Sequence, residues 1–224
     1  LTSGGANTIT VSKAGSITTT GTAAYGVYNT GNTNETTVSG NITTGGIDAY
    51  GIVNAGDTNE TTVSGNITTA GTNAWGLLNY GNTNETTVSG NITTAEDGAF
   101  GVYNTGNSNE TTVSGSIVTA GDHGYGIFDY GDRNITTVSG SIVTAGNSAH
   151  GILINGDNNT TTISGSVTSL GTASSALMAS DGSDGTFILD EGAVIIGDIT
   201  ALADAKNNSL KFNLGASTSY AYSV

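Results

Sequence analysis

The sequence lacks cysteine and proline and contains few charged residues. Without cysteine, a disulfide framework and thiol chemistry are excluded. Only 4 basic residues face 18 acidic ones, a net charge of -14. That sign repels polyphosphate, so we expect no nucleic acid partner. The longest aliphatic run, Ala193–Ile196, is too short to cross a bilayer, so we expect no membrane insertion of this segment.

What the sequence does contain is one motif repeated at a constant spacing. GNTNETTVSG occupies residues 31–40 and 81–90, and near-copies begin at residues 56, 106, 131 and 156. Each start follows the previous one by 25 residues. Aliphatic residues and glycine recur at the same interval, in the columns headed by Val27, Val38, Gly40 and Ile42. A fixed period of this length is typical of solenoids.

The apolar columns lie two residues apart, which is the period of a strand and not of a helix. Their members are β-branched or aromatic, as strands prefer, and Gly, Asn and Asp cluster between them, as in turns. One repeat cannot bury its own apolar side, but stacked repeats can. The sequence therefore predicts an all-β fold, a right-handed parallel β-solenoid (β-helix) with 25-residue coils. Eight or nine coils would form a rod about 40 Å long.

The regular repeat covers residues 1–179, and residues 180–224 are expected to continue the same solenoid irregularly. The stretch IIGDIT at 195–200 matches VSGNIT at 38–43. This match predicts that Ile195 takes the place of Val38 and Ile199 that of Ile42. A further strand is expected within residues 208–217. We interpret the chain as a piece of a longer protein.

Two further sets of columns are predicted to form ladders along the rod. Asparagine side chains can hydrogen-bond to their copies in the next coil, and Asn tolerates left-handed turn geometry. The asparagine ladder comprises Asn34, Asn59, Asn84, Asn109, Asn134 and Asn159. The aromatic ladder comprises Tyr25, Tyr50, Trp75, Phe100 and Tyr125. Its spacing of two residues from the column of Val27 indicates a shared strand face, and Tyr80 and Tyr130 are candidate surface contacts.

The sequence offers little for metal binding or catalysis. Glu35, Glu60, Glu85 and Glu110 form a column that is expected to point into solvent, although a divalent cation between coils is an alternative. Polar residues that could serve an enzyme gather only around His123, Asp129, Asp132 and His150. They match no nucleophile–base, phosphate-loop or metal-ligand pattern. We therefore expect no catalytic residues, no cofactor, no metal and no enzymatic activity.

The 25-residue Thr-, Asn- and Gly-rich repeats and the stretch GAVIIGDITALADAKNNSLKFNLGAS resemble the passenger region of bacterial autotransporters, the type V secretion family. This resemblance implies a right-handed β-helix that is exported and displayed on the bacterial cell surface. Adhesion, autoaggregation and biofilm formation are common tasks of the family. It has no shared site motif, so the resemblance implies no functional residues.

The leading hypothesis is a non-catalytic, extracellular or cell-surface β-solenoid that acts in adhesion, in self-association or as a structural spacer. Its partners would be other copies of the chain or ligands on host or neighbouring cells, bound through contacts repeated once per coil. One alternative is a subunit of an extracellular filament or sheath, a homopolymer formed by end-to-end stacking. A further alternative is an ice-binding surface, because Thr and Ser recur on the polar strand faces.

Overall fold

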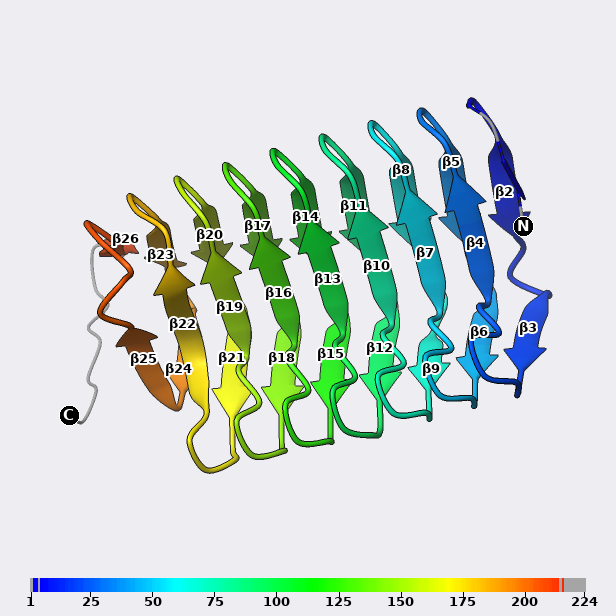
Figure 1. Ribbon diagram of the computed structural model, residues 1–224. Coiled ribbons are helices and arrows are strands. Elements are labelled where there is room, and N and C mark those ends of the chain that lie inside the picture. The colour runs from blue at the N-terminus through cyan, green and yellow to red at the C-terminus, as the bar shows by residue number, and fades with distance from the viewer. Residues whose placement is uncertain (1, 4, 214, 216–224) are drawn as a thin grey trace.

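The computed structural model describes residues 2–3, 5–213 and 215, and all regular structure in this part of the chain is β. Three parallel sheets run side by side along a rod (Figure 1). The predicted all-β parallel β-solenoid is thereby confirmed.

Each coil contributes one strand to each sheet. Sheet A contains β1 (Thr2–Ser3), β4 (Val27–Thr30), β7 (Ile52–Ala55), β10 (Leu77–Tyr80), β13 (Val102–Thr105), β16 (Ile127–Tyr130), β19 (Ile152–Asn155), β22 (Ser175–Asp181) and β25 (Asp198–Ala201). Sheet B contains β2 (Thr8–Val11), β5 (Glu35–Val38), β8 (Glu60–Val63), β11 (Glu85–Val88), β14 (Glu110–Val113), β17 (Ile135–Val138), β20 (Thr160–Ile163), β23 (Thr186–Asp190) and β26 (Ser209–Asn213). Sheet C contains β3 (Ser16–Thr19), β6 (Asn41–Thr44), β9 (Ile67–Thr69), β12 (Asn91–Thr94), β15 (Ser116–Thr119), β18 (Ser141–Thr144), β21 (Ser166–Ser169) and β24 (Val194–Ile196).

The path of one coil explains the constant repeat length. After β4 the chain turns through residues 31–34 into β5, passes the short corner at residues 39–40 into β6, and returns through residues 45–51 to β7. In Figure 1 the chain runs up sheet A at the front, crosses to sheet B behind it and comes back through sheet C below, which is a right-handed winding. Strand pairs from β4 to β21 join residues 25 apart, so each side chain lies on its own copy in the next coil.

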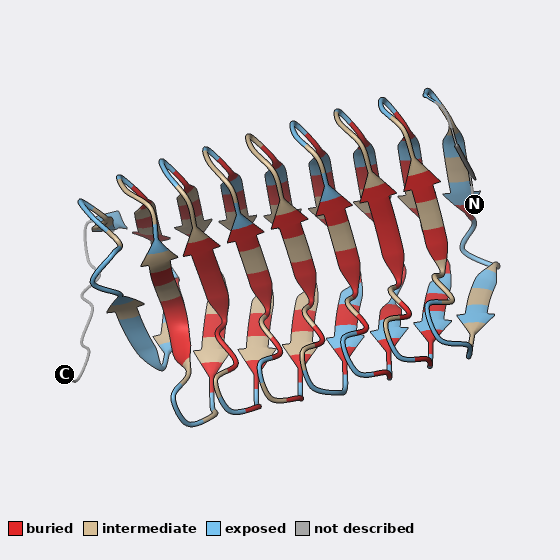
Figure 2. Ribbon diagram, viewed as in Figure 1, coloured by how far each residue is buried: buried red, intermediate tan, exposed pale blue. Residues whose placement is uncertain are grey.

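The interior consists of the aliphatic columns that the repeat predicts. Val38, Ile42 and Ile52 and most of their copies in the central coils are completely buried, and Figure 2 shows buried residues along the strands of these coils. Burial of each such side chain contributes about 1.5–3 kcal/mol. The stacked coils therefore supply the hydrophobic core that a single coil lacks.

The interior also contains a polar ladder, which is separate from the corner asparagines. Asn29, Asn54, Asn79 and Asn104 lie inside sheet A, each at most 1% exposed. The Asn79 Nδ2 donates to Thr86 Oγ1 at 2.9 Å and to Asn104 Oδ1 at 2.8 Å. Each amide thus bonds across the coil and along the rod, as a buried polar group requires.

The last coils correct the alignment predicted for IIGDIT. Ile195 pairs with Val167 in sheet C and thus takes the place of Ile42, whereas Ile199 pairs with Leu177 in sheet A. Leu189 pairs with Ile163 and occupies the place expected for Ile195. The error arose because Gly197 resembles the glycine between sheets B and C. It instead forms the whole corner between β24 and β25, where earlier coils use residues 45–51 or their copies.

The solenoid continues beyond residue 179 through β23, β24, β25 and β26. The strand expected within residues 208–217 is β26, Ser209–Asn213. The remainder of that prediction falls partly on residues 214, 216 and 217, which lie outside the described residues.

Candidate functional site

The outer surface of sheet A differs from those of the other two sheets. Sheets B and C present mainly Glu, Thr, Ser and Asn to solvent, as in the outward residues Glu60, Thr62 and Thr68, and their exposed aliphatic residues include Ile135 and Ile196. The outer side of sheet A and of the corner before it instead presents ten of the chain's 14 aromatic residues. We define these as the aromatic face: Tyr25, Tyr28, Tyr50, Trp75, Tyr80, Phe100, Tyr103, Tyr125, Phe128 and Tyr130.

The aromatic ladder lies on this outer face and does not share the inner face of the Val27 column, contrary to the sequence prediction. A Cβ atom on Gly76 would stand 2.3 Å from the Ile92 side chain, so this glycine faces the interior. Ala74 and Leu77 are fully buried, and Trp75 between them is only partly covered. Because Gly76 and Leu77 both face inward at the corner, the simple alternation of a strand fails there and Trp75 points outward.

The rings of the ladder stack along the rod. Ring centroids of Tyr50 and Trp75 lie 4.5 Å apart with an interplanar angle of 1°, and those of Phe100 and Tyr125 lie 4.8 Å apart at 4°. The ring centroids of Tyr25 and Tyr50 lie 5.2 Å apart, and those of Trp75 and Phe100 lie 5.3 Å apart. Parallel rings at these distances stabilise the pairs by about 0.5–1.5 kcal/mol each.

A second aromatic column contains Tyr28, Tyr103 and Phe128. The rings of Tyr103 and Phe128 pack at right angles to the ladder, and the ring of Tyr28 is tilted by 31° to that of Tyr25. Tyr103 stacks on Phe128 at 5.0 Å, and its ring is nearly perpendicular to Trp75 at 88°. Burial raises the pKa of Tyr50, Tyr103 and Tyr125 above the ordinary phenol value of 10.0, at which the group is already protonated at neutral pH. The two columns therefore form an ordered, uncharged layer of rings.

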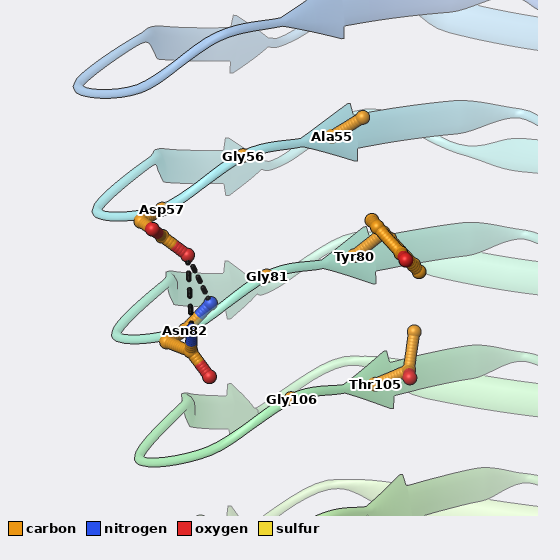
Figure 3. A pocket seen from close by; sticks show the side chains of 8 residues that line it. All are labelled: Ala55, Gly56, Asp57, Tyr80, Gly81, Asn82, Thr105 and Gly106. Atoms are coloured by element: carbon orange, nitrogen blue, oxygen red, sulfur yellow. Dashed lines mark hydrogen bonds between the residues drawn. The ribbon is translucent and has the colours of Figure 1, made fainter.

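Tyr80 and Tyr130, the two candidate surface contacts, are the most exposed members of the aromatic face, at 63% and 49%. They belong to the outermost column of sheet A, where Ala55 and Thr105 stand in neighbouring coils. A shallow depression of about 500 Å³ surrounds Tyr80 (Figure 3). Its lining residues are Ala55, Gly56, Asp57, Tyr80, Gly81, Asn82, Thr105 and Gly106.

The asparagines predicted as a ladder are buried at the corner between sheets A and B. Each member from Asn34 to Asn134 donates its backbone N–H to the Oδ1 of the next, at 2.8–2.9 Å. All six are at most 2% exposed. These bonds commit the side-chain oxygens to the backbone and stabilise the turn, while the Nδ2 atoms of Asn84, Asn109 and Asn134 are buried without a hydrogen-bond partner.

The polar residues considered for catalysis are placed apart. Asp129 lies in the interior, and the exposed His123 precedes strand β16 while Asp132 follows it. The ring centroids of His150 and Tyr125 lie 5.2 Å apart, and the planes of the two rings are tilted by 37° to each other. Burial, together with nearby His123, lowers the pKa of His150. Its Nδ1 accepts a hydrogen bond from the Ser175 backbone at 3.0 Å, so the imidazole is neutral and committed to the corner.

Two further features concern metals and membranes. In the described part of the chain, no group of three or more His, Asp and Glu residues is arranged to hold a metal ion. Residues 2–3, 5–213 and 215 include no helix of the length and apolarity needed to span a membrane.

Comparison with protein families, curated proteins and solved structures finds no match to this chain.

The sequence contained a signal for the aromatic face that the two-residue spacing obscured. Every aromatic in the ladder is followed directly by glycine, as in Tyr50-Gly51 and Trp75-Gly76. A glycine between an aromatic and an aliphatic residue permits a corner in which the two side chains point to opposite sides. If each aromatic-glycine pair is interpreted as a corner, the sequence predicts that the rings point outward.

Proposed function

We propose that this chain is a non-catalytic, extracellular β-solenoid that mediates adhesion or self-association through its aromatic face. One observation carries this proposal: ten aromatic side chains are gathered on the outer side of sheet A and of the corner before it, whereas the other sheets present mainly small polar and acidic residues. Large exposed apolar patches on soluble proteins mark interaction surfaces. Aromatic residues are also the types most enriched at the centres of interfaces.

The mode of binding follows from the repeat. Equivalent outward side chains recur at intervals of about 4.8 Å along the rod, so weak contacts can be made many times over. The ladders fix these side chains in position, which lowers the entropy lost when a partner binds. Such a rod gains affinity by avidity and needs no deep pocket.

The resemblance to autotransporter passenger regions supports display on the bacterial cell surface as the setting for this function. The absence of cysteine and the repetitive, self-stabilising coils agree with an extracellular location. Antibody labelling of intact cells that express the complete gene tests this localisation. Labelling that appears only after permeabilisation would contradict it.

The adhesive role is tested with beads coated with the purified chain. We expect the beads to aggregate or to be retained on cell monolayers, and uncoated beads to do neither. The triple variant Tyr80→Thr, Tyr103→Val and Tyr130→Thr should lose at least half of this adhesion. Each substitution installs a residue that occupies the same column in another coil: Thr105 lies in the coil next to Tyr80 and Tyr130, and Val53 lies two coils before Tyr103.

The matched control carries three changes on sheet C: Thr43→Val, Thr68→Val and Thr93→Val, after the Val that stands at 118 and 143. This variant should retain adhesion, since sheet C lies on another side of the rod. Equal loss in both variants, or no adhesion by the original chain, would refute the proposal. Long uniform fibres in electron micrographs would favour the filament alternative.

A further inference from the structure

Tyr80 differs from the stacked rings of the aromatic face in its neighbours along the rod. Rings such as Trp75 and Phe100 are covered on both sides by the rings above and below them. Tyr80 stands between Ala55 and Thr105, whose side chains are too small to cover a ring. Figure 3 shows the Tyr80 side chain projecting from β10 between these two coils. Its ring is therefore available to stack on a ligand.

Polar groups lie beside this ring at the corner after the strand. The Asp57 Oδ1 accepts hydrogen bonds from the Asn82 backbone N–H at 2.7 Å and from its Nδ2 at 3.2 Å. These bonds hold the carboxylate in place, and its second oxygen can accept a hydrogen bond from a ligand hydroxyl. The depression thus combines an open aromatic ring with an oriented acceptor.

A related arrangement occurs at Tyr130, two coils further along sheet A, but there the corner amide belongs to the preceding coil and the carboxylate to the coil of the tyrosine. Asn155 is the neighbour of Tyr130 in the next coil, and the Phe128 ring meets the Tyr130 ring edge-on, with centroids 5.9 Å apart. Tyr130 is also exposed and also has Thr105 as its neighbour on one side. The corner beside it again holds one amide and one carboxylate, Asn107 and Asp132, joined by the hydrogen bond from the Asp132 backbone N–H to Asn107 Oδ1 at 2.7 Å. Two strand spacings, about 9.6 Å, separate the two rings along the rod.

We propose that Tyr80 and Tyr130 form two subsites for one neutral, linear, β-1,4-linked glycan chain that lies along the rod axis. The apolar C–H face of a pyranose ring packs on an aromatic ring, and its hydroxyls bond to carboxylates and amides at the edge. Successive sugars in a flat β-1,4-linked chain are flipped, so the same face recurs at every second sugar. That two-sugar repeat is close to two strand spacings, about 9.6 Å.

The negative charge of the protein favours neutral glycans over anionic ones. The corner carboxylates Asp57 and Asp132 flank the subsites, and the chain carries a net charge of -14. Anionic polysaccharides would be repelled, as like charges close together are. A neutral glycan meets no such repulsion and satisfies the carboxylates with its hydroxyl donors. This inference rests on the proposed adhesive function and names the ligand class of the same face.

Calorimetric titration of the full chain with cellohexaose and with chitohexaose tests the proposal. At least one should bind, while maltohexaose, whose α-1,4 linkage curves the chain, and the anionic hexagalacturonate should bind at least tenfold more weakly. Tyr80→Thr and Tyr130→Thr should each weaken binding at least tenfold, and the double variant should abolish it. Thr stands in the same column at Thr105, so these variants are expected to fold.

Two controls make the test specific. Thr93→Val changes an outward residue of sheet C, outside the aromatic face, to the residue that stands beside it at Val118, and should leave glycan affinity within about twofold. Insertion of a second copy of residues 81–105 after Thr105 would place Tyr80 and Tyr130 three coils apart. The two rings would then meet sugars that present opposite pyranose faces, and affinity should fall to that of the single Tyr→Thr variants.

Unchanged affinity in the insertion variant or in the double variant would overturn the proposal. So would the absence of binding to both hexasaccharides, or equal binding of maltohexaose. The bead assay separates this failure from failure of the proposed function. Beads that still adhere through the aromatic face, without any glycan binding, would refute the glycan ligand and leave the adhesive role standing.

Discussion

At the scale of single residues, Asp129 is an exception in the polar ladder inside sheet A. The four coils before it carry asparagine at this position, and the next coil carries Ile154. Asp129 is 1% exposed, and it accepts hydrogen bonds from Asn104 Nδ2 and Thr136 Oγ1, each at 2.7 Å. Burial raises the pKa of this carboxyl above its ordinary value of 3.8, and the two hydrogen bonds oppose the rise only in part. The ladder therefore contains a carboxyl group whose ionisation the fold disfavours.

This burial predicts how stability depends on pH. Below pH 3.8 the carboxyl is protonated in both the folded and the unfolded chain and imposes no penalty. As pH rises, the unfolded chain ionises first, so stability is lost until the pKa of the folded state is passed. We expect Asp129→Asn to raise the free energy of unfolding at pH 7 by about 1–3 kcal/mol and to have little effect at pH 3.

Denaturant unfolding at the two pH values measures this difference. Asp132→Asn is the matched control, because it makes the same chemical change in the same coil at a corner where other coils already carry Asn. Its effect should stay within about 0.5 kcal/mol. Equal stabilisation by both variants would assign the effect to net charge and contradict the account of Asp129.

At the scale of the element, the corner between sheets B and C decides how closely coils approach. A Cβ atom on Gly90 would lie 1.9 Å from the carbonyl oxygen of Gly65, and the same conflict recurs at the other glycines of this column in the central coils. Real atoms cannot approach so closely, and here the obstacle is backbone. The short Ser-Gly corner thus exists because glycine permits adjacent coils to keep strand spacing.

We expect Gly90→Ala to destabilise the chain by at least about 3 kcal/mol or to prevent folding. Gly45→Ala is the control, because its added Cβ would lie no closer than 3.7 Å to any neighbour, and Ala stands at that position in the next four coils. Gly45→Ala should be neutral or stabilising by up to about 1 kcal/mol. Thermal unfolding followed by circular dichroism compares the two, and similar melting temperatures would contradict this description of the corner.

At the scale of the whole molecule, stability comes from the superposition of coils of equal length. Each coil contacts mainly its two neighbours, so whole coils are exchangeable units. Deletion of Gly81–Thr105 removes one complete coil and joins Tyr80 to Gly106 in the same turn context. The product should fold with unchanged strand signal in circular dichroism and a rod shorter by about 4.8 Å in small-angle scattering.

Deletion of Gly81–Thr93 removes only about half as much sequence but should be far more disruptive. It joins the end of a sheet A strand to the last residue of a sheet C strand, so the coil cannot close through sheet B. The strands β14 and β15 would then lose β11 and most of β12, with which they pair. A half-coil deletion that folds as well as the whole-coil deletion would refute the role of constant coil length.

The fold was accessible from the sequence because its information is local and repeated. The columns of Val38, Ile42 and Gly40 recur with one period, and stacking is the arrangement that buries all of them at once. Prediction failed where the repeat degenerates, as at Ile195 and Ile199, because similarity of a few residues cannot show which corner a glycine occupies. That choice depends on which neighbouring strands remain to be paired.

The sequence by itself determined that this chain forms a parallel β-solenoid, since a period of 25 residues with apolar columns admits one way of burial. Only the tertiary structure decided which columns face outward. The inward turn of Gly76 moves Trp75 and its copies to the surface, and the small neighbours Ala55 and Thr105 leave Tyr80 uncovered. Such directions arise from contacts between coils, which the order of residues within one coil does not contain.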